Sequence, residues 1–298
     1  MRKFFNKIRH RKPLSAQDIA DALMRRGISR NDITSAHLAA IYRRLNKISS
    51  TPDFTSVKDI LPRYPPSGDT DSYPAIGVII ETRKHPALCD VVCSFQERLQ
   101  IPIQLFHGQM NLDYIMASSI SELERTGKVR LVKLNAEALN ARQYNALLLT
   151  ELFWTHLLSR KKILIFQTDA ILCGNSNYTL NDFLSFDYIG SKWNRQRPVG
   201  LLIDGGNGGL SLRDWKKSHE CLVRFPPKHW IGGEDGYFAF HIDIIGGKVG
   251  RDADCARFST QYEFLYKSLG AHQISSLDQE SKLAFLQYCE EARFMSER

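Results

Sequence analysis

At residues 161–172 the chain reads Lys-Lys-Ile-Leu-Ile-Phe-Gln-Thr-Asp-Ala-Ile-Leu, an apolar and β-branched run that leads to a single carboxylate. Charged residues precede the run and polar residues follow its apolar part, which is typical of a strand covered on both faces in an α/β sheet. Ligands of open α/β sheets bind at the carboxyl ends of such strands. We therefore predict a buried strand over 161–172 that brings Asp169 to a ligand site.

Strands alternate with helices on the N-terminal side of this stretch. Three further strands are predicted at residues 75–82, 102–106 and 129–134. Helical patterns separate them, and a helix over 140–158 leads into the central strand. This alternation predicts βαβ crossovers and a mixed, mainly parallel α/β sheet flanked by helices.

The chain downstream of the central strand is richer in loops and glycine. Its predicted elements are short strands at 187–190 and 209–212, a glycine cluster at 205–209, a turn into a short helix at 230–239, and helices over 252–266 and 276–293. We expect this half to carry the catalytic loops.

The N-terminal region differs in composition from the rest. Residues 1–12 carry six basic side chains and no acid, and residues 15–45 show helical spacing with further arginines. Prolines among Ser, Thr and Asp then predict a linker or surface wrap. We predict a basic helical extension over 1–50, a linker over 51–73, a catalytic domain over 74–275 and a C-terminal helix over 276–298.

Composition limits the class of protein. The 298 residues are 43% hydrophobic, as in ordinary globular proteins, and carry a formal net charge of +8, which favours anionic partners. No apolar segment follows the basic tail and no stretch is long enough to span a membrane, so we expect a cytoplasmic protein. Six scattered cysteines contain no C-x-x-C pair, and we expect buried or free thiols instead of a zinc site or a disulfide framework.

Three features are candidates for chemistry. Neither a P-loop nor a G-x-G-x-x-G turn is present, which argues against P-loop ATPases and ordinary dinucleotide dehydrogenases. What remains is the acid Asp169, the glycine cluster with Asn207, and the acid pair Glu234-Asp235. A cation that holds a diphosphate needs one or two carboxylates, and an acid on a turn can act as a general base. Helix capping or turn formation explains each feature equally well when it is taken alone.

The order of these features carries a resemblance. The chain contains Thr82-Arg83, Tyr144-Asn145, Phe166-Gln167-Thr168-Asp169, Gly206-Asn207-Gly208-Gly209-Leu210-Ser211-Leu212-Arg213, Glu234-Asp235-Gly236-Tyr237-Phe238 and Gly270-Ala271-His272. This set resembles a domain-of-unknown-function family classed with glycosyltransferases of the GT-A fold, over roughly residues 74–275. It is more distantly similar to inverting β-glycosyltransferases, in which a D-x-D strand end, a glycine-rich segment and an E-D-V-Y turn recur.

The resemblance implies a role for each matching position. Asp235 takes the place of the catalytic base, with Glu234 beside it, and His272 that of a late metal or diphosphate ligand. Asp169 takes the metal or donor-diphosphate position. The remaining donor-binding positions are Thr82, Arg83, Gln167, Asn207, Gly208 and Gly209.

Gln167 departs from the pattern, because it stands where a D-x-D motif has its first acid. A divalent cation, Mn or Mg, is therefore an expected cofactor whose need is open. The diphosphate charge can instead be met by Arg83, Lys192 or Arg213. Trp193 and Trp230 are candidates for stacking on an acceptor sugar, with burial in the core as the alternative.

The predicted function is transfer of a sugar from a nucleotide-sugar donor to a hydroxyl of a glycan, polysaccharide or lipid-linked acceptor. The sequence leaves two alternatives open: a nucleotidyltransferase, and a basic module that binds nucleic acid or a membrane without catalysis. For the transferase, residues 1–47 can make peripheral contact with a cytoplasmic membrane face, and nucleic acid is not an expected partner.

Overall fold

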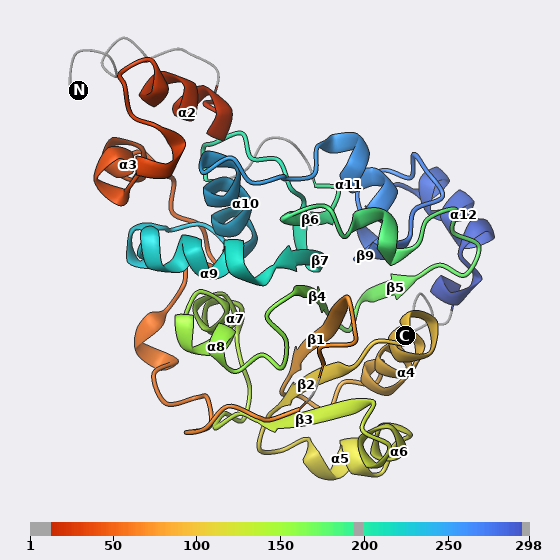
Figure 1. Ribbon diagram of the computed structural model, residues 1–298. Helices are drawn as coiled ribbons and strands as arrows, with labels where there is room; N and C mark the ends of the chain where they lie inside the picture. Colours follow the sequence, from red (N-terminus) through yellow and green to blue (C-terminus); the bar gives the residue numbers. More distant parts are fainter. Residues whose placement is uncertain (1–12, 69, 194–198, 294–298) are drawn as a thin grey trace.

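The computed structural model describes residues 13–68, 70–193 and 199–293. Six strands form a central sheet in the order β3-β2-β1-β4-β7-β6 (Figure 1). Strand β7 is antiparallel to both neighbours, and the other pairs are parallel. The prediction of a mixed, mainly parallel α/β sheet is confirmed. The strands are β1 (Ala75–Glu81), β2 (Ile103–His107), β3 (Val129–Lys133), β4 (Lys162–Phe166), β6 (Tyr188–Ser191) and β7 (Asn207–Asp214).

Helices cover both faces of the sheet, so β4 is buried on both sides as predicted. Ile163 and Ile165 join one core cluster, while Leu164 and Phe166 join another, because successive side chains of a strand point to opposite faces. The first cluster packs under α7 (Ala141–Leu148), α8 (Glu151–Thr155), α9 (Trp215–Arg224) and α10 (Glu234–Ile244). The second packs under α4 (Leu88–Leu99), α5 (Leu112–Met116), α6 (Ile120–Arg125) and α11 (Asp252–Phe258).

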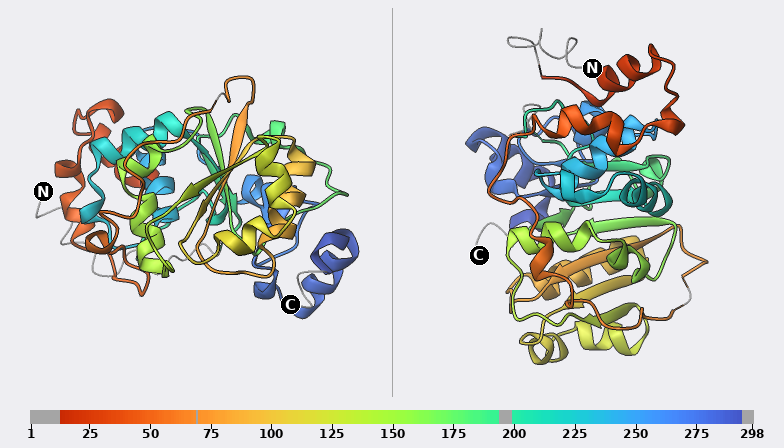
Figure 2. Two further views of the ribbon diagram at one scale, coloured as in Figure 1. Left: turned by 90° about the horizontal axis from the view of Figure 1, so that it is seen from below. Right: turned by 90° about the vertical axis from the view of Figure 1, so that its left-hand side faces the viewer.

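The N-terminal region contributes α2 (Ala16–Met24) and α3 (Ser35–Tyr42), at the end of the molecule opposite α5 and α6 (Figure 2). Both helices add buried side chains to the core cluster that contains α10. The Arg30 guanidinium donates to the Asp243 carbonyl (2.7 Å) and the Ile244 carbonyl (3.2 Å) at the end of α10. The predicted basic tail at 1–12 lies outside the described residues, and the predicted domain limits stay predictions.

The stretch 161–172 is two strands instead of one. β4 ends at Phe166, the Ala170 amide donates to the Gln167 carbonyl (3.0 Å), and β5 (Ala170–Leu172) enters a second sheet of order β5-β9-β8. The other strands of that sheet are β8 (Ser259–Thr260) and β9 (Gly270–His272). Asp169 therefore stands in the turn between two sheets, a position that an apolar run does not reveal.

Two predicted helices are also interrupted. The helix over 140–158 divides into α7 and α8, and the Thr150 hydroxyl caps α8 by accepting from the Phe153 amide (3.3 Å). The helix over 252–266 ends at Phe258, because the chain then pairs as β8. The predicted C-terminal helix is α12 (Gln279–Tyr288), followed by the short 3₁₀ helix η7 (Glu290–Ala292).

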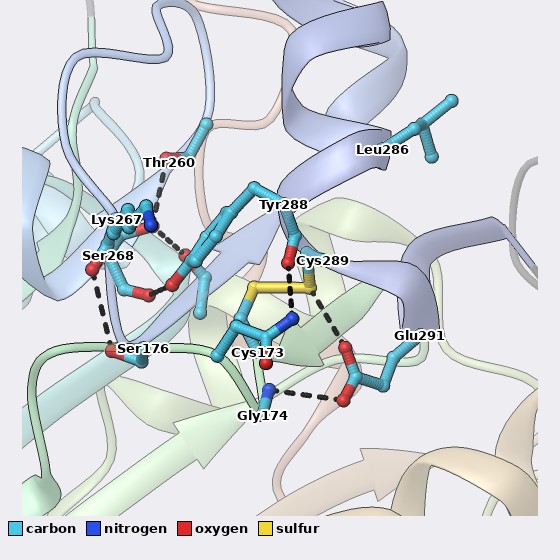
Figure 3. The surroundings of a disulfide bond; sticks show 12 residues. Cys173, Gly174, Ser176, Thr260, Lys267, Ser268, Leu286, Tyr288, Cys289 and Glu291 are labelled. Carbon is cyan, nitrogen blue, oxygen red and sulfur yellow. Dashed lines mark hydrogen bonds between the residues drawn. A yellow bond between two sulfur atoms is a disulfide. The ribbon is translucent and has the colours of Figure 1, made fainter.

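The expectation of unpaired thiols is wrong for two of the six cysteines. Cys173, which follows β5, forms a disulfide with Cys289, 116 residues later (Figure 3). The bond joins the C-terminal segment to β5 beside a third, smaller core that includes Phe285 and Tyr288. Such a pair has no sequence signature, since folding alone brings the two cysteines together.

The cellular location stays a prediction. No helix among the described residues is both long and apolar enough to cross a membrane. Disulfides are rare in the cytosol, so the Cys173–Cys289 bond is an observation against the predicted cytoplasmic location.

Loss of this disulfide should loosen the C-terminal segment. We expect the double variant Cys173→Ser/Cys289→Ser to lose about 2–5 kcal/mol of unfolding free energy, because the cross-link closes a long loop. Urea denaturation measures the loss, and hydrogen exchange should rise in residues 279–292 but not in β1–β3. Cys89→Ser/Cys93→Ser, which removes two free thiols, is the control. Equal stability of the two double variants would contradict the prediction.

Candidate functional site

A cavity of about 870 Å³ opens where β1 and β4 end and where the antiparallel β7 begins. The N-terminus of α10 forms another side of it. Residues far apart in the sequence meet here because parallel strands end at one edge of the sheet. The cavity lining includes all ten residues to which the family resemblance gives a role: Thr82, Arg83, Gln167, Asp169, Asn207, Gly208, Gly209, Glu234, Asp235 and His272.

The end of β1 presents Arg83 to the cavity. The Glu81 carboxylate accepts from the Arg83 backbone amide (2.8 Å), Nε (2.9 Å) and Nη2 (2.8 Å), and this pairing raises the pKa of Arg83. The Arg83 side chain is nevertheless 62% exposed. Thr82 is buried, and its hydroxyl accepts from the Leu139 amide (3.0 Å), which holds the loop before α7. Arg83 is thus a fixed but accessible cation.

Asp169 and His272 form a pair across the cavity floor. Strand β5 pairs with β9, which places Asp169 Oδ1 3.2 Å from His272 Nε2. Gln167 Oε1 lies 3.3 Å from the same nitrogen. Burial raises the pKa of Asp169, but the hydrogen bond and charge of His272 outweigh burial and bring that pKa below its ordinary value. At Gly209 a Cβ atom would lie 2.0 Å from His272 Nε2, so a side chain there would displace the imidazole.

Glu234 has a structural partner. Its carboxylate accepts from Arg213 Nη1 and, at 3.0 Å, from Nη2, and both side chains are buried. Burial lowers the pKa of Arg213, but the Glu234 charge outweighs burial and holds that pKa above its ordinary value. Gly208 makes room for the pair, because a Cβ there would lie 2.4 Å from Glu234 Oε1. With both oxygens bonded to Arg213, the Glu234 carboxylate fixes the first turn of α10.

Asp235 follows directly, as the second residue of α10, and lines the cavity at 9% exposure. The Asn145 side chain fixes this turn: its Oδ1 accepts from the Glu234 amide (3.1 Å) and its Nδ2 donates to the Ser50 carbonyl (2.8 Å). The turn that carries Asp235 is therefore fixed by the Arg213–Glu234 pair and by Asn145, and the Asp235 carboxylate accepts from the Gly236 amide (2.6 Å).

Some predicted contributors lie elsewhere. Of the three candidate cations only Arg83 lines the cavity, because Arg213 is buried against Glu234 and Lys192 pairs with Glu263. Of the two interpretations of Trp193 and Trp230, stacking on an acceptor sugar or burial in the core, the structure shows burial. Both are buried, and their indole N–H groups donate to the Ile203 and Gly233 carbonyls (2.9 and 2.8 Å).

Sequence reasoning missed several lining residues. Glu81 carries a signal, since it lies two positions before Arg83 at the end of the same strand. Tyr144, which the Tyr144-Asn145 motif names without a role, also lines the cavity, and its hydroxyl is buried. Tyr262 and Gln273 also line the cavity and carry no local pattern that could have identified them.

Comparison with known proteins gives a family without an assigned activity. Residues 128–273, just under half of the chain, match DUF5672, described as a protein of unknown function. The matched segment contains Asp169, Asp235 and His272. None of the curated proteins matches the sequence.

Solved structures give distant likenesses at 12–13% identity. One, from Bacillus anthracis and described as a glucose-1-phosphate thymidylyltransferase in complex with sucrose, has a TM-score of 0.38 and covers 57% of this chain and 83% of its own. The glycosyltransferase GlyE of Streptococcus pneumoniae TIGR4 matches with TM-scores of 0.36 and, in its apo form, 0.42. These matches cover 57% and 72% of this chain, and 43% and 59% of the GlyE chains.

The buried Arg213–Glu234 pair should matter for stability. Arg213→Met leaves a buried carboxylate without its partner and should lower the unfolding free energy by about 3–5 kcal/mol. The matched change at Arg125, whose partner Glu122 is exposed like Arg125 itself, should cost far less, because exposed ion pairs contribute little to stability. In the double variant Arg213→Met/Glu234→Leu no lone charge remains, so the loss should be smaller than for Arg213→Met alone. Urea denaturation of the three variants tests this, and equal losses for Arg213→Met and Arg125→Met would refute it.

Proposed function

We propose that the protein is a glycosyltransferase with a GT-A-like sheet that moves a sugar from a nucleotide-sugar donor to an acceptor hydroxyl. The observation that carries the proposal is one cavity that gathers Arg83, Asp169 and Asp235 from three distant parts of the chain. A volume of about 870 Å³ is within the range of small-molecule sites, and the lining offers a cation, a half-exposed carboxylate and a second carboxylate.

The donor diphosphate is proposed to lie between Arg83 and Asp169. Arg83 is the one Lys or Arg side chain among the described residues that line the cavity, and its guanidinium suits phosphate oxygens. Thr82, Gln167, Asn207, Gly208 and Gly209 would border the nucleotide and the donor sugar.

A divalent cation, Mn or Mg, fits beside Asp169 and His272. Among the described residues no group of three or more His, Cys, Asp or Glu side chains is placed to hold a metal. Two protein ligands suffice, however, when phosphate oxygens and water fill the other positions. Asp169 Oδ1 and His272 Nε2, which lie 3.2 Å apart, are the two protein atoms that would hold the cation. When bound, the cation would supply positive charge to the leaving diphosphate.

The proposed reaction is a single displacement with inversion. Asp235 accepts the proton of the acceptor hydroxyl, the oxygen forms a bond to the anomeric carbon, and the bond from that carbon to the diphosphate oxygen breaks. The nucleoside diphosphate leaves with the electron pair, and Arg83 stabilises its charge. Glu234 and Arg213 keep Asp235 in place.

The acceptor is proposed to be a glycan, a polysaccharide or a lipid-linked saccharide. Peripheral contact with an anionic membrane face is a further proposal. It rests on the exposed arginines of the N-terminal helices, including Arg25, Arg26 and Arg43.

The donor site can be tested by a thermal-shift screen of nucleoside diphosphates and nucleotide sugars with and without Mn²⁺. At least one nucleotide should stabilise the protein, by about 2.7 kcal/mol at 100 times its Kd, and Mn²⁺ should increase the effect. Asp169→Asn should lose the Mn²⁺-dependent part, whereas Asp113→Asn, a change to an exposed aspartate outside the cavity, should behave as the unchanged protein. The function is contradicted if no nucleotide stabilises the protein.

The base can be tested with the donor that the screen identifies. Asp235→Asn should lower kcat for sugar transfer by about 10²–10⁴-fold, because the acceptor hydroxyl loses its proton acceptor, while the thermal shift by nucleotide stays unchanged. Asp113→Asn again serves as the control for transfer. Normal turnover of Asp235→Asn would remove Asp235 from the mechanism.

A further inference from the structure

The segment between β8 and β9 forms a closed loop, which we call the Tyr262 loop (residues 261–267). Its base is fastened by a hydrogen bond between the Thr260 and Ser268 hydroxyls (2.9 Å) and by the Tyr288 hydroxyl, which donates to the Ser268 carbonyl (2.6 Å) (Figure 3). Compact loops with tied ends and internal packing are frequently functional. The Tyr262 loop is therefore shaped independently of any ligand.

The inner side of the loop is anchored. The Phe264 ring packs edge-on against Phe285 (5.4 Å between centroids) and stacks on Tyr288 (5.5 Å), so the loop rests on the C-terminal segment. Gln261 Nε2 donates to Gln273 Oε1 (3.2 Å), which ties the loop to the cavity edge. Gln273 itself has a φ of +52°, a strained value for a residue other than glycine, directly after His272. The cavity edge is thus held in one conformation.

The outer side of the loop is apolar and exposed. Tyr262, Leu265 and Tyr266 are 41%, 57% and 38% exposed. Exposed apolar side chains grouped in this way mark interaction sites. The Arg257 guanidinium covers the Tyr266 ring (5.4 Å), whereas no aromatic ring or cation among the described residues stacks on Tyr262. Tyr262 is also the member of the three that lines the cavity.

We propose that the Tyr262 ring is a stacking platform for a pyranose ring of a saccharide. The face of an aromatic ring carries negative charge, which suits the partly positive C–H groups on the flat side of a pyranose. Tyr262 and Arg83 line the same cavity from different strands, since Arg83 follows β1 and Tyr262 follows β8, which contacts β6 through the Ser191–Ser259 hydroxyl pair (2.7 Å). We identify this saccharide with the acceptor, and that identification rests on the proposed function. The existence of a saccharide site at Tyr262 does not depend on the proposed function.

The test uses cellobiose and N,N′-diacetylchitobiose as probes in saturation-transfer NMR on the full chain. Stacking on a ring tolerates different sugars, so at least one disaccharide should bind with millimolar affinity. Tyr262→Ala should weaken binding roughly 3- to 10-fold, since ring stacking contributes about that factor. Tyr262→Phe keeps the ring and should bind as the unchanged protein. Tyr266→Ala, the same change in the same loop outside the cavity, should also leave binding unchanged.

The outcomes separate this site from the proposed function. If neither disaccharide binds, or if Tyr262→Ala binds as well as the unchanged protein, the saccharide site is overturned. It is also overturned if phosphatidylglycerol vesicles, and no disaccharide, bind through Tyr262, because the loop then faces a membrane. Disaccharide binding that depends on Tyr262, without any nucleotide binding in the thermal-shift screen, would support the site and refute the glycosyltransferase.

Discussion

The antiparallel pairing of β7 with β4 is the constraint on which the site depends. It sets Phe166 opposite Leu210, and the Gln167 amide donates to the Gly209 carbonyl (2.9 Å). This register brings the start of β7 against the turn that carries Asp169. The other end of β7 carries Arg213, which donates to Glu234 at the beginning of α10. A shift of the β4–β7 register by one residue would turn every side chain of β7 to the opposite face of the sheet. It would separate Arg213 from Glu234 and the start of β7 from the turn that carries Asp169.

Close contacts between backbone and charged groups explain the glycines of this strand. Gly208 leaves space for the Arg213–Glu234 pair, and Gly209 leaves space for His272. The glycines of this motif, which resembles a donor-sugar segment, are therefore also needed to pack the Arg213–Glu234 pair and His272. These glycines serve the folded protein whether or not a ligand is bound, and the ligand role remains the proposal.

The C-terminal segment supports the cavity from outside the central sheet. Strand β5 directly follows Asp169, β9 ends at His272, and the third core packs α12 against both strands. The Cys173–Cys289 bond fastens this arrangement, and Phe264 connects the Tyr262 loop to it. A region that the sequence suggests is a simple closing helix thus positions one edge of the proposed site.

The sequence by itself determined the parts that depend on local patterns. The apolar run at 163–166 predicts a strand buried on both faces, and alternation with helices predicts a mainly parallel sheet, because side-chain periodicity reflects which surface is buried. The ordered motifs also named many of the residues that line the cavity, but not Glu81, Tyr262 or Gln273. Only the tertiary structure decided what each charge does. Glu234 and Asp235 are adjacent in sequence and both line the cavity, yet Glu234 is held in a buried ion pair with Arg213 from β7. Long-range contacts leave no periodic pattern in the sequence. They determine the pairing of strands, the disulfide between residues 116 apart and the burial of Trp193 and Trp230.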